Sequence, residues 1–190
     1  MKKKVSKILL INTPRLTLKQ LNEYSERSKY YWEVYPPLGF MYISAAVKNE
    51  IDYSEIKVLD LHIESIKKSQ KNQTVDWLEM TEDCMKSFEP DMVAISVMFG
   101  ASFESAQLVG KFLRKNYPDL VIASGGVHVT GIVKEKNNGL EFNDFVIIKE
   151  SEKHFPQLVK YLNEETDLVN GVIPIKTNKV RNDEHFTKDT

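Results

Sequence analysis

Short apolar runs rich in Val and Ile recur along the whole chain, and this pattern constrains its fold more than any other feature. The runs are continuous rather than alternating, which is typical of parallel strands that are buried on both faces. Such strands need helices on either side of the sheet to cover them. The runs are Ile8–Ile11, Ile56–Leu61, Met92–Val97, Val121–Ala123, Phe145–Ile148 and Val172–Ile175.

Between these runs lie segments whose apolar side chains recur three or four positions apart, the period of one helix face. Residues 130–143 show only weak helical periodicity. The alternation of strand and helix predicts an α/β fold with a doubly wound, mostly parallel sheet, a flavodoxin-like or Rossmann-like three-layer sandwich with right-handed crossovers. The helical stripes are Leu38, Met41, Tyr42 and Ala45, directly after Pro37; Val75, Leu78, Met85 and Phe88; Ala106, Val109 and Leu113; and Phe155, Leu158, Val159 and Leu162.

A length of 190 residues suits one domain with a full hydrophobic core. We expect residues 1–175 to form this domain and the polar residues 176–190 to form a tail or linker. The segment Arg15–Pro36 is longer than an ordinary strand-to-helix loop. Because it carries the aromatic residues Tyr30–Trp32, we expect it to fold over the ligand face, dock a partner domain or pack on the first helix.

Charge and cysteine content exclude several classes of function. The chain has 26 Lys and Arg against 27 Asp and Glu, so its formal charge of −1 lacks the basic excess typical of nucleic-acid-binding proteins. The single cysteine, Cys84, cannot form an internal disulfide, a cysteine zinc site or an iron–sulfur cluster. No apolar stretch has the length of a signal-peptide core or a membrane span, so we expect a cytoplasmic protein without a membrane partner.

In a doubly wound sheet, ligands bind at the carboxyl ends of the strands, where the strand order reverses. The segments expected there are Asn12–Pro14, Ser96–Gly100, Ser124–His128 and Lys149–Glu152. None of them contains the Gly-x-Gly-x-x-Gly of dinucleotide sites, the Gly-x-x-x-x-Gly-Lys-Ser/Thr phosphate loop or the Gly-x-Ser-x-Gly nucleophile motif. The pattern therefore indicates a ligand site without naming a catalytic residue.

Five blocks of the sequence carry a family resemblance. They are Lys7–Pro14, Pro36–Tyr42, Pro90–Met98, Ser124–His128 and Asp144–Glu152. In this order they resemble the N-terminal cobalamin-binding domain of cobalamin-dependent radical S-adenosylmethionine enzymes. The resemblance covers the chain from Lys7 to Ile175, and the ordered blocks are together more specific than any one of them.

The resemblance implies that the chain binds cobalamin. Gly125 and Gly126 lack side chains where a large planar ligand or its nucleotide tail would press on the sheet, and Ser96 offers a small hydroxyl to the tail. Met98 and Phe99 offer apolar contact to a corrin face. Alternatively, the glycines and the serine serve only the geometry of a turn. The implied cofactor-binding residues are Thr13, Pro14, Gly39, Ser96, Met98, Phe99, Gly125, Gly126, His128, Glu150 and Glu152.

Two departures from the family pattern limit these implications. The family's usual Gly-Glu-Gly-Glu after the fifth strand is Lys149-Glu150-Ser151-Glu152 here, so two glycines that let backbone approach a ligand are lost. The Cys-x-x-x-Cys-x-x-Cys of the catalytic domain is absent. An iron–sulfur cluster and S-adenosylmethionine would therefore belong to a downstream methyltransferase or cyclase domain, in cis or in trans, and the chain is a fragment or a protein without that domain.

The expected function is thus a cobalamin-binding accessory module that serves a radical S-adenosylmethionine domain. The changed Lys149–Glu152 loop favours an alternative, a non-enzymatic interaction module that keeps the fold without the cofactor. A phosphoacceptor receiver is disfavoured, because the first strand ends in Asn12–Pro14 without the acidic cluster that binds magnesium.

The histidines bear on how cobalt is ligated. The segment Asp60–Ser65 imitates the Asp-x-His-x-x-Gly loop of methionine-synthase-type domains through His62, but a serine replaces the glycine and the segment follows the second strand. In the strand order 2-1-3-4-5 that strand lies at the sheet edge, so we expect base-off cobalamin with no protein ligand on the metal. His128 is expected to touch a corrin amide or to be a hydrogen-bonded turn residue. His154 and His185 are expected at the surface.

Glu150 and Glu152 are the paired carboxylates of the predicted site. They could accept hydrogen bonds from corrin amides or from a ribose hydroxyl, or solvate the start of a helix. Since no nucleophile or metal cluster accompanies them, they do not indicate acid–base catalysis.

Overall fold

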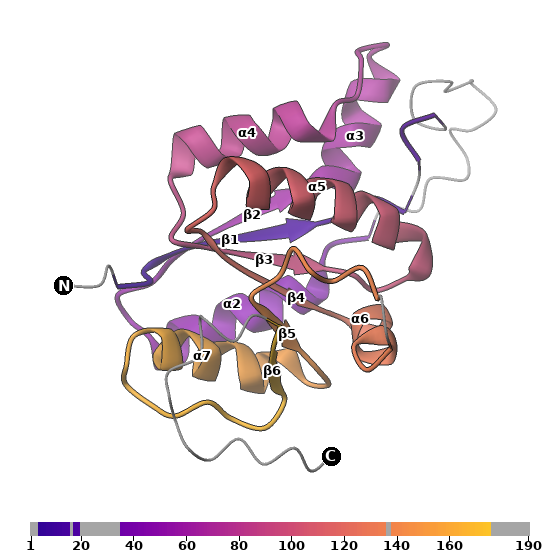
Figure 1. Cartoon of the computed structure of the whole chain (residues 1–190). Helices are drawn as coiled ribbons and strands as arrows, with labels where there is room; N and C mark the ends of the chain where they lie inside the picture. Colours follow the sequence, from indigo (N-terminus) through magenta and orange to yellow (C-terminus); the bar gives the residue numbers. More distant parts are fainter. Residues whose placement is uncertain (1–3, 16, 20–34, 136–137, 176–190) are drawn as a thin grey trace.

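A six-stranded sheet forms the centre of the molecule (Figure 1). The computed structural model describes residues 4–15, 17–19, 35–135 and 138–175. The strand order is β2-β1-β3-β4-β5-β6, which confirms the flavodoxin-like order 2-1-3-4-5 and the doubly wound α/β class. The strands are β1 (Lys7–Asn12), β2 (Glu55–Asp60), β3 (Met92–Ser96), β4 (Val121–Gly125), β5 (Phe145–Ile147) and β6 (Val172–Pro174).

Helices cover both faces of this sheet. One layer consists of α2 and α7, and the opposite layer consists of α3, α4 and α5 (Figure 1). The short α6 follows β4 at the carboxyl end of the sheet. The helices are α2 (Leu38–Glu50), α3 (Leu61–Gln70), α4 (Trp77–Phe88), α5 (Phe103–Asn116, preceded by a 3-10 turn at Gly100–Ser102), α6 (Val127–Ile132) and α7 (Ser151–Leu162).

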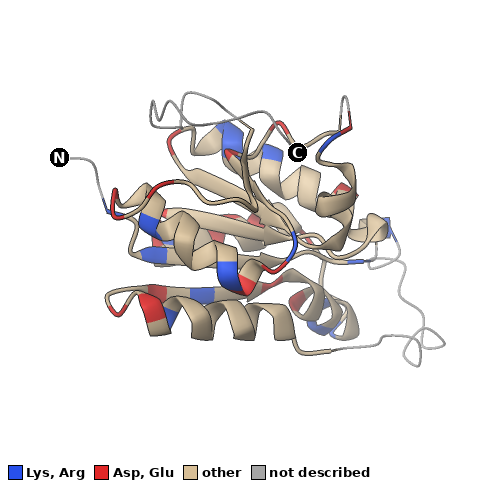
Figure 2. Cartoon of the chain, turned by 90° about the horizontal axis from the view of Figure 1, so that it is seen from below, with Lys and Arg blue, Asp and Glu red and all other residues tan. Residues whose placement is uncertain are grey.

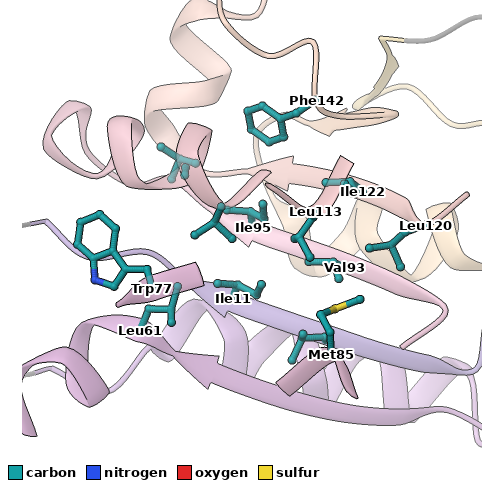
Figure 3. Packing of buried hydrophobic residues seen from close by; sticks show 14 of the residues in the cluster. Ile11, Leu61, Trp77, Met85, Val93, Ile95, Leu113, Leu120, Ile122 and Phe142 are labelled. Carbon is teal, nitrogen blue, oxygen red and sulfur yellow. The ribbon is translucent and has the colours of Figure 1, made fainter. Parts of the chain in front are cut away.

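Two hydrophobic cores, one on each face of the sheet, explain why the strand sequences are continuously apolar. In β1, Leu9 and Ile11 belong to the core under α3–α5, whereas Ile8 and Leu10 belong to the core under α2 and α7. Figure 3 shows the α3–α5 core, in which strand residues such as Ile11 face Trp77 and other helix side chains. Charged residues are instead interspersed along helices and loops (Figure 2).

The two edge strands depart from the expected parallel, doubly buried pattern. β6 pairs antiparallel with β5, since segment 163–171 returns the chain to the carboxyl end of the sheet before the strand begins. β2 has a single neighbour, and most of its residues are exposed or half-buried, Val58 among them. The apolar runs therefore predicted the presence of both edge strands, but not the direction of β6 or the exposure of β2.

Helix α2 packs on the sheet with a different face from the one that the sequence predicts. Leu38, Met41 and Tyr42, expected in the core, are 57%, 59% and 67% exposed. The buried residues of this helix are Phe40 and Val47. Because apolar side chains surround α2 on nearly every side, periodicity alone could not distinguish its inner face from its outer face.

The weakly periodic segment 130–143 is mostly loop. Helix α6 ends at Ile132, and Leu140 and Phe142 enter the core without helical structure. Phe142 lies where a side chain at Gly110 of α5 would otherwise be. Helix α3, which was not predicted, begins where the apolar run of β2 ends, at Leu61, and Asp60 caps it by accepting the Ile63 N–H at 3.0 Å.

The stripes predicted for α5 and α7 are confirmed, since all residues of both stripes are buried. The stripe predicted for α4 is confirmed in part, since Met85 and Phe88 are buried in the helix, Leu78 is half-buried and Val75 is buried before the helix begins. Within the described part of the chain, none of the helices combines the length and the apolar content that crossing a membrane requires.

Candidate functional site

A pocket of about 340 Å³ lies at the carboxyl ends of β3, β4 and β5, between the sheet and the α2–α7 layer. This is the side of the sheet end at which doubly wound folds bind ligands. Its volume lies in the range of small-molecule sites. The lining residues are Gly39, Phe40, Ile43, Ala94, Ile95, Ser96, Met98, Ala123, Ser124, Gly125, Gly126, Val127, Thr130, Ile147, Lys149, Ser151, Glu152 and Phe155.

The two helices that flank the pocket run side by side and are joined at the end away from it. Their first turns supply Gly39 of α2 and Ser151 of α7 to the pocket. At the last turns, the Lys160 ammonium of α7 lies 2.7 Å from the Glu50 carboxylate of α2, and Gln157 donates to the same carboxylate at 2.9 Å. The two walls of the pocket are therefore joined at the end away from it.

The pocket is apolar in its depth and polar at its rim. Buried strand residues with small side chains, Ala94 and Ala123, leave room under the helices, and Ile147 and Phe155 complete the apolar lining. The strand ends and the start of α7 bring Ser96, Lys149, Ser151 and Glu152 to the rim. This arrangement suits a ligand with an apolar end inside and a polar part outside.

Gly126 is required by the backbone of the β4–α6 turn. Its φ is +116°, and a β-carbon there would lie 2.5 Å from the Val97 carbonyl oxygen. The two loops are also hydrogen-bonded, since Val97 N–H donates to the Gly125 carbonyl at 2.8 Å and His128 N–H donates to the Val97 carbonyl at 3.3 Å. The backbone conformation of Gly126 therefore allows the turn after β4 to form these hydrogen bonds with the residue that follows β3.

Gly125 has a different role, because it keeps the pocket open. A β-carbon at Gly125 would lie 3.2 Å from the Ser151 Oγ, so the start of α7 approaches the end of β4 closely. Ser96, at the end of β3, is half-buried, and its hydroxyl has no hydrogen-bond partner among the described residues. That hydroxyl is available to a ligand.

Of the predicted site residues, more than half come together around this pocket. The predicted residues that line it are Gly39, Ser96, Met98, Gly125, Gly126 and Glu152. The predicted residues that do not line it are Thr13, Pro14, Phe99, His128 and Glu150.

Thr13 and Pro14 are buried and contact neighbouring backbone instead of the pocket. The Thr13 hydroxyl donates to the Ser96 carbonyl at 2.9 Å, and the Pro14 carbonyl accepts from the Ser105 hydroxyl at 2.9 Å. These bonds tie the end of β1 to β3 and α5. Both residues thus position the strand end that carries Ser96.

Phe99, His128 and Glu150 lie outside the pocket lining. Phe99 is 52% exposed, and the Arg15 guanidinium lies 5.1 Å from the centre of its ring. The His128 ring packs edge-on against Phe103 at 4.9 Å. Glu150 is exposed, 3.8 Å from the Lys153 ammonium.

The sequence reasoning missed several pocket residues. Val127, 69% exposed at the rim, lies in the block Ser124–His128 but was not among the predicted site residues. Phe155 belongs to a helical stripe that predicts core, and it is both core and pocket wall. The sequence places Lys149 in a strand-end segment, where the family has a glycine, but does not predict it as a site residue; its backbone is left-handed, with a φ of +61°. That conformation favours glycine and so matches the family pattern.

Two histidines have structural surroundings that the sequence did not predict. His154, expected to be a plain surface residue, packs on Gly171, and its Nδ1 lies 3.1 Å from the Ile148 carbonyl oxygen. His62 is buried in α3 and does not line the pocket. Asp60, its neighbour in the imitated motif, caps α3 and accepts from the Asn12 side-chain amide at 3.1 Å.

The other predicted features, the aromatic residues Tyr30–Trp32, His185 and the tail 176–190, lie outside the described residues. Among the described residues, no three His, Cys, Asp or Glu side chains gather as a metal site.

Fold and pocket together define a flavodoxin-like ligand-binding domain with its site at the strand ends. Within that class, the profile of the B12 binding domain family matches residues 32–159, which is well over half of the chain. The chain therefore belongs to the B12 binding domain family.

Among solved structures, the chain is similar to a novel cobalamin-binding protein from Desulfitobacterium hafniense DCB-2. The sequence identity is 15% and the TM-score is 0.45. The match covers 85% of this chain and 59% of that protein, so the chain spans well under two thirds of its length. No sequence among curated proteins matches this chain.

Proposed function

We propose that this chain is a cobalamin-binding module that holds the nucleotide tail of the cofactor in the pocket between the sheet and the α2–α7 layer. The observation that carries the proposal is this pocket, kept open by Gly125 and by small strand residues in a chain of the B12 binding domain family. The residues present fit the tail, because its aromatic base suits the apolar depth and its ribose hydroxyls suit the Ser96 hydroxyl at the rim.

The corrin ring would lie over the strand ends outside the pocket. Met98, Phe99 and Val127 support this position, since they expose 46%, 52% and 69% of their surface there. Exposed apolar side chains in one place are costly in water and favour contact with a broad apolar surface. A corrin face provides such a surface.

With the nucleotide tail in this pocket, the base of the tail would lie away from cobalt, so the cofactor would be base-off. We further propose that no histidine replaces the base. His62 lies in α3, in the layer opposite the pocket, and the His128 ring packs on Phe103. Neither arrangement supports a ligand on the lower face of the corrin.

The catalytic partner would be a radical S-adenosylmethionine domain outside this sequence. Cobalamin supplies a reactive cobalt centre when bound, and the residues of this chain bind and orient the cofactor. The proposal rests on the order of the five sequence blocks and on the rim at the strand ends, where a partner has access to the ligand.

The test is a titration of the protein with hydroxocobalamin, followed by gel filtration. Wild type should retain the pigment. Gly39→Leu should weaken binding about tenfold or more, equal to ~1.4 kcal/mol, because its side chain enters the pocket. A β-carbon at Gly39 or at Gly131 would meet no atom within 4 Å, and Gly131 does not line the pocket, so Gly131→Leu is the matched control.

Failure of folded wild type to retain any pigment would contradict the proposal and favour an interaction module without the cofactor. Equal affinity of Gly39→Leu and wild type would remove this pocket from the site.

A further inference from the structure

Lys149 occupies an unusual position at the rim of the pocket. It follows β5 by two residues, lines the pocket beside Ser151 and Glu152, and is exposed. Its φ of +61° places a non-glycine residue in the left-handed region. A β-carbon makes this conformation unfavourable, so the side chain is retained at an energetic cost.

The Lys149 ammonium has no ion-pair or hydrogen-bond partner among the described residues, in contrast to two lysines of α7. Lys153, four positions on, lies 3.8 Å from the Glu150 carboxylate, and Lys160 lies 2.7 Å from Glu50. Lys149 thus brings an uncompensated positive charge to the rim.

The other ionisable residue that lines the pocket is Glu152, which is exposed. An anionic ligand group at this rim meets the negative charge of Glu152 and needs a cation to offset it. The apolar depth of the pocket favours an uncharged aromatic base, so the charged part of the same ligand remains at the rim. Lys149 is the cationic residue that lines it.

We infer that Lys149 is a specificity-determining residue that pairs with the anionic phosphodiester joining the corrin side chain to the nucleotide tail. The inference rests on the proposed function. Where the resembled family has a glycine, this chain has a cationic side chain on a left-handed backbone, the conformation that glycine favours. Loss of the glycine therefore changes how the tail is held rather than removing the site.

The experiment compares three ligands that differ in the tail. Cobalamin carries the phosphodiester and the base, cobinamide phosphate keeps the phosphate without the nucleoside, and cobinamide lacks both. Lys149→Met should weaken cobalamin and cobinamide phosphate roughly twofold to fivefold and leave cobinamide unchanged, since an ion pair of an exposed lysine has this magnitude.

Lys149→Arg should restore affinity by keeping the charge. Salt should weaken cobalamin binding to wild type more than to Lys149→Met, because exposed ion pairs are screened. The matched control is Lys153→Met, which removes a lysine from the same helix start that does not line the pocket, and it should bind all three ligands as wild type does.

Two outcomes overturn the inference while the proposed function stands. One is a Lys149→Met variant with wild-type affinity for cobalamin, and the other is an equal loss for all three ligands. If wild type binds none of the three, the proposed function itself fails and the inference falls with it.

Discussion

The Arg114 guanidinium donates to the Asp144 carboxylate at 2.7 Å, and the same carboxylate oxygen accepts the Ile122 N–H at 2.9 Å. Asp144 is fully buried directly before β5, and Ile122 lies in β4. Arg114 also donates to the carbonyl oxygens of Phe142 and Leu120. This ion pair thus connects α5 with β4 and β5, two of the three strands whose carboxyl ends form the pocket.

Removal of one partner of this pair should be strongly destabilising. Arg114→Met leaves the buried Asp144 carboxylate without its cation, and we expect a loss of about 3–5 kcal/mol in the free energy of unfolding. Urea denaturation measures it. Lys67→Met, which breaks the exposed Lys67–Glu64 pair, is the control and should change stability little. Equal stability of the two variants would show that the Asp144 pair does not hold the strands.

Substitution of Gly126 should affect folding before it affects binding. A side chain at its φ of +116° is strained and meets the Val97 carbonyl oxygen, so Gly126→Ala should cost about 1–3 kcal/mol. Gly126→Val, which we would expect from sequence to block the tail, should lose binding through the same damage to the turn. Gly39→Ala is the control, with no expected loss. Thermal unfolding measures both, and a Gly126→Ala protein as stable as wild type would contradict the strain.

Lys149→Gly should have opposite effects on stability and on affinity. Glycine relieves the left-handed strain, which costs about 1–2 kcal/mol, but it loses about 0.5–1 kcal/mol to chain entropy on folding. The free energy of unfolding should therefore rise by up to about 1.5 kcal/mol in urea denaturation. Affinity for cobalamin should fall as it does in Lys149→Met. A variant that is clearly less stable than wild type would show that the Lys149 side chain supports the fold.

The spectra of the complex should not depend on any histidine of the described chain. His62→Gln, His128→Gln and His154→Gln should each give the base-off visible spectrum of wild type. The electron paramagnetic resonance of the cobalt(II) form should lack histidine-nitrogen hyperfine splitting. A nitrogen pattern in wild type that disappears in one variant would identify that histidine as a ligand.

The sequence predicted most of the sheet because strands buried on both faces must be apolar throughout, as Ile8–Ile11 are. It predicted the rim at Ser96 and Gly125–Gly126 because loops after strands must meet at one end of a parallel sheet. It could not show that Phe155 lines a pocket as well as belonging to the core, because an apolar side chain suits both positions. The sequence could not predict the positive φ of Lys149, because lysine has no preference for the left-handed conformation.

The reversed direction of β6 determines where the chain leaves the sheet. Pro174 pairs with Phe145, and Ile175 N–H donates to the Asp144 carbonyl at 2.8 Å, so the exit lies at the amino ends of the neighbouring strands, opposite the pocket. A domain fused after the 15 residues 176–190 has a tether of at most roughly 50 Å at full extension. Because the described chain leaves the sheet on the side away from the pocket, a partner that reaches the ligand from the strand ends approaches the face opposite this exit.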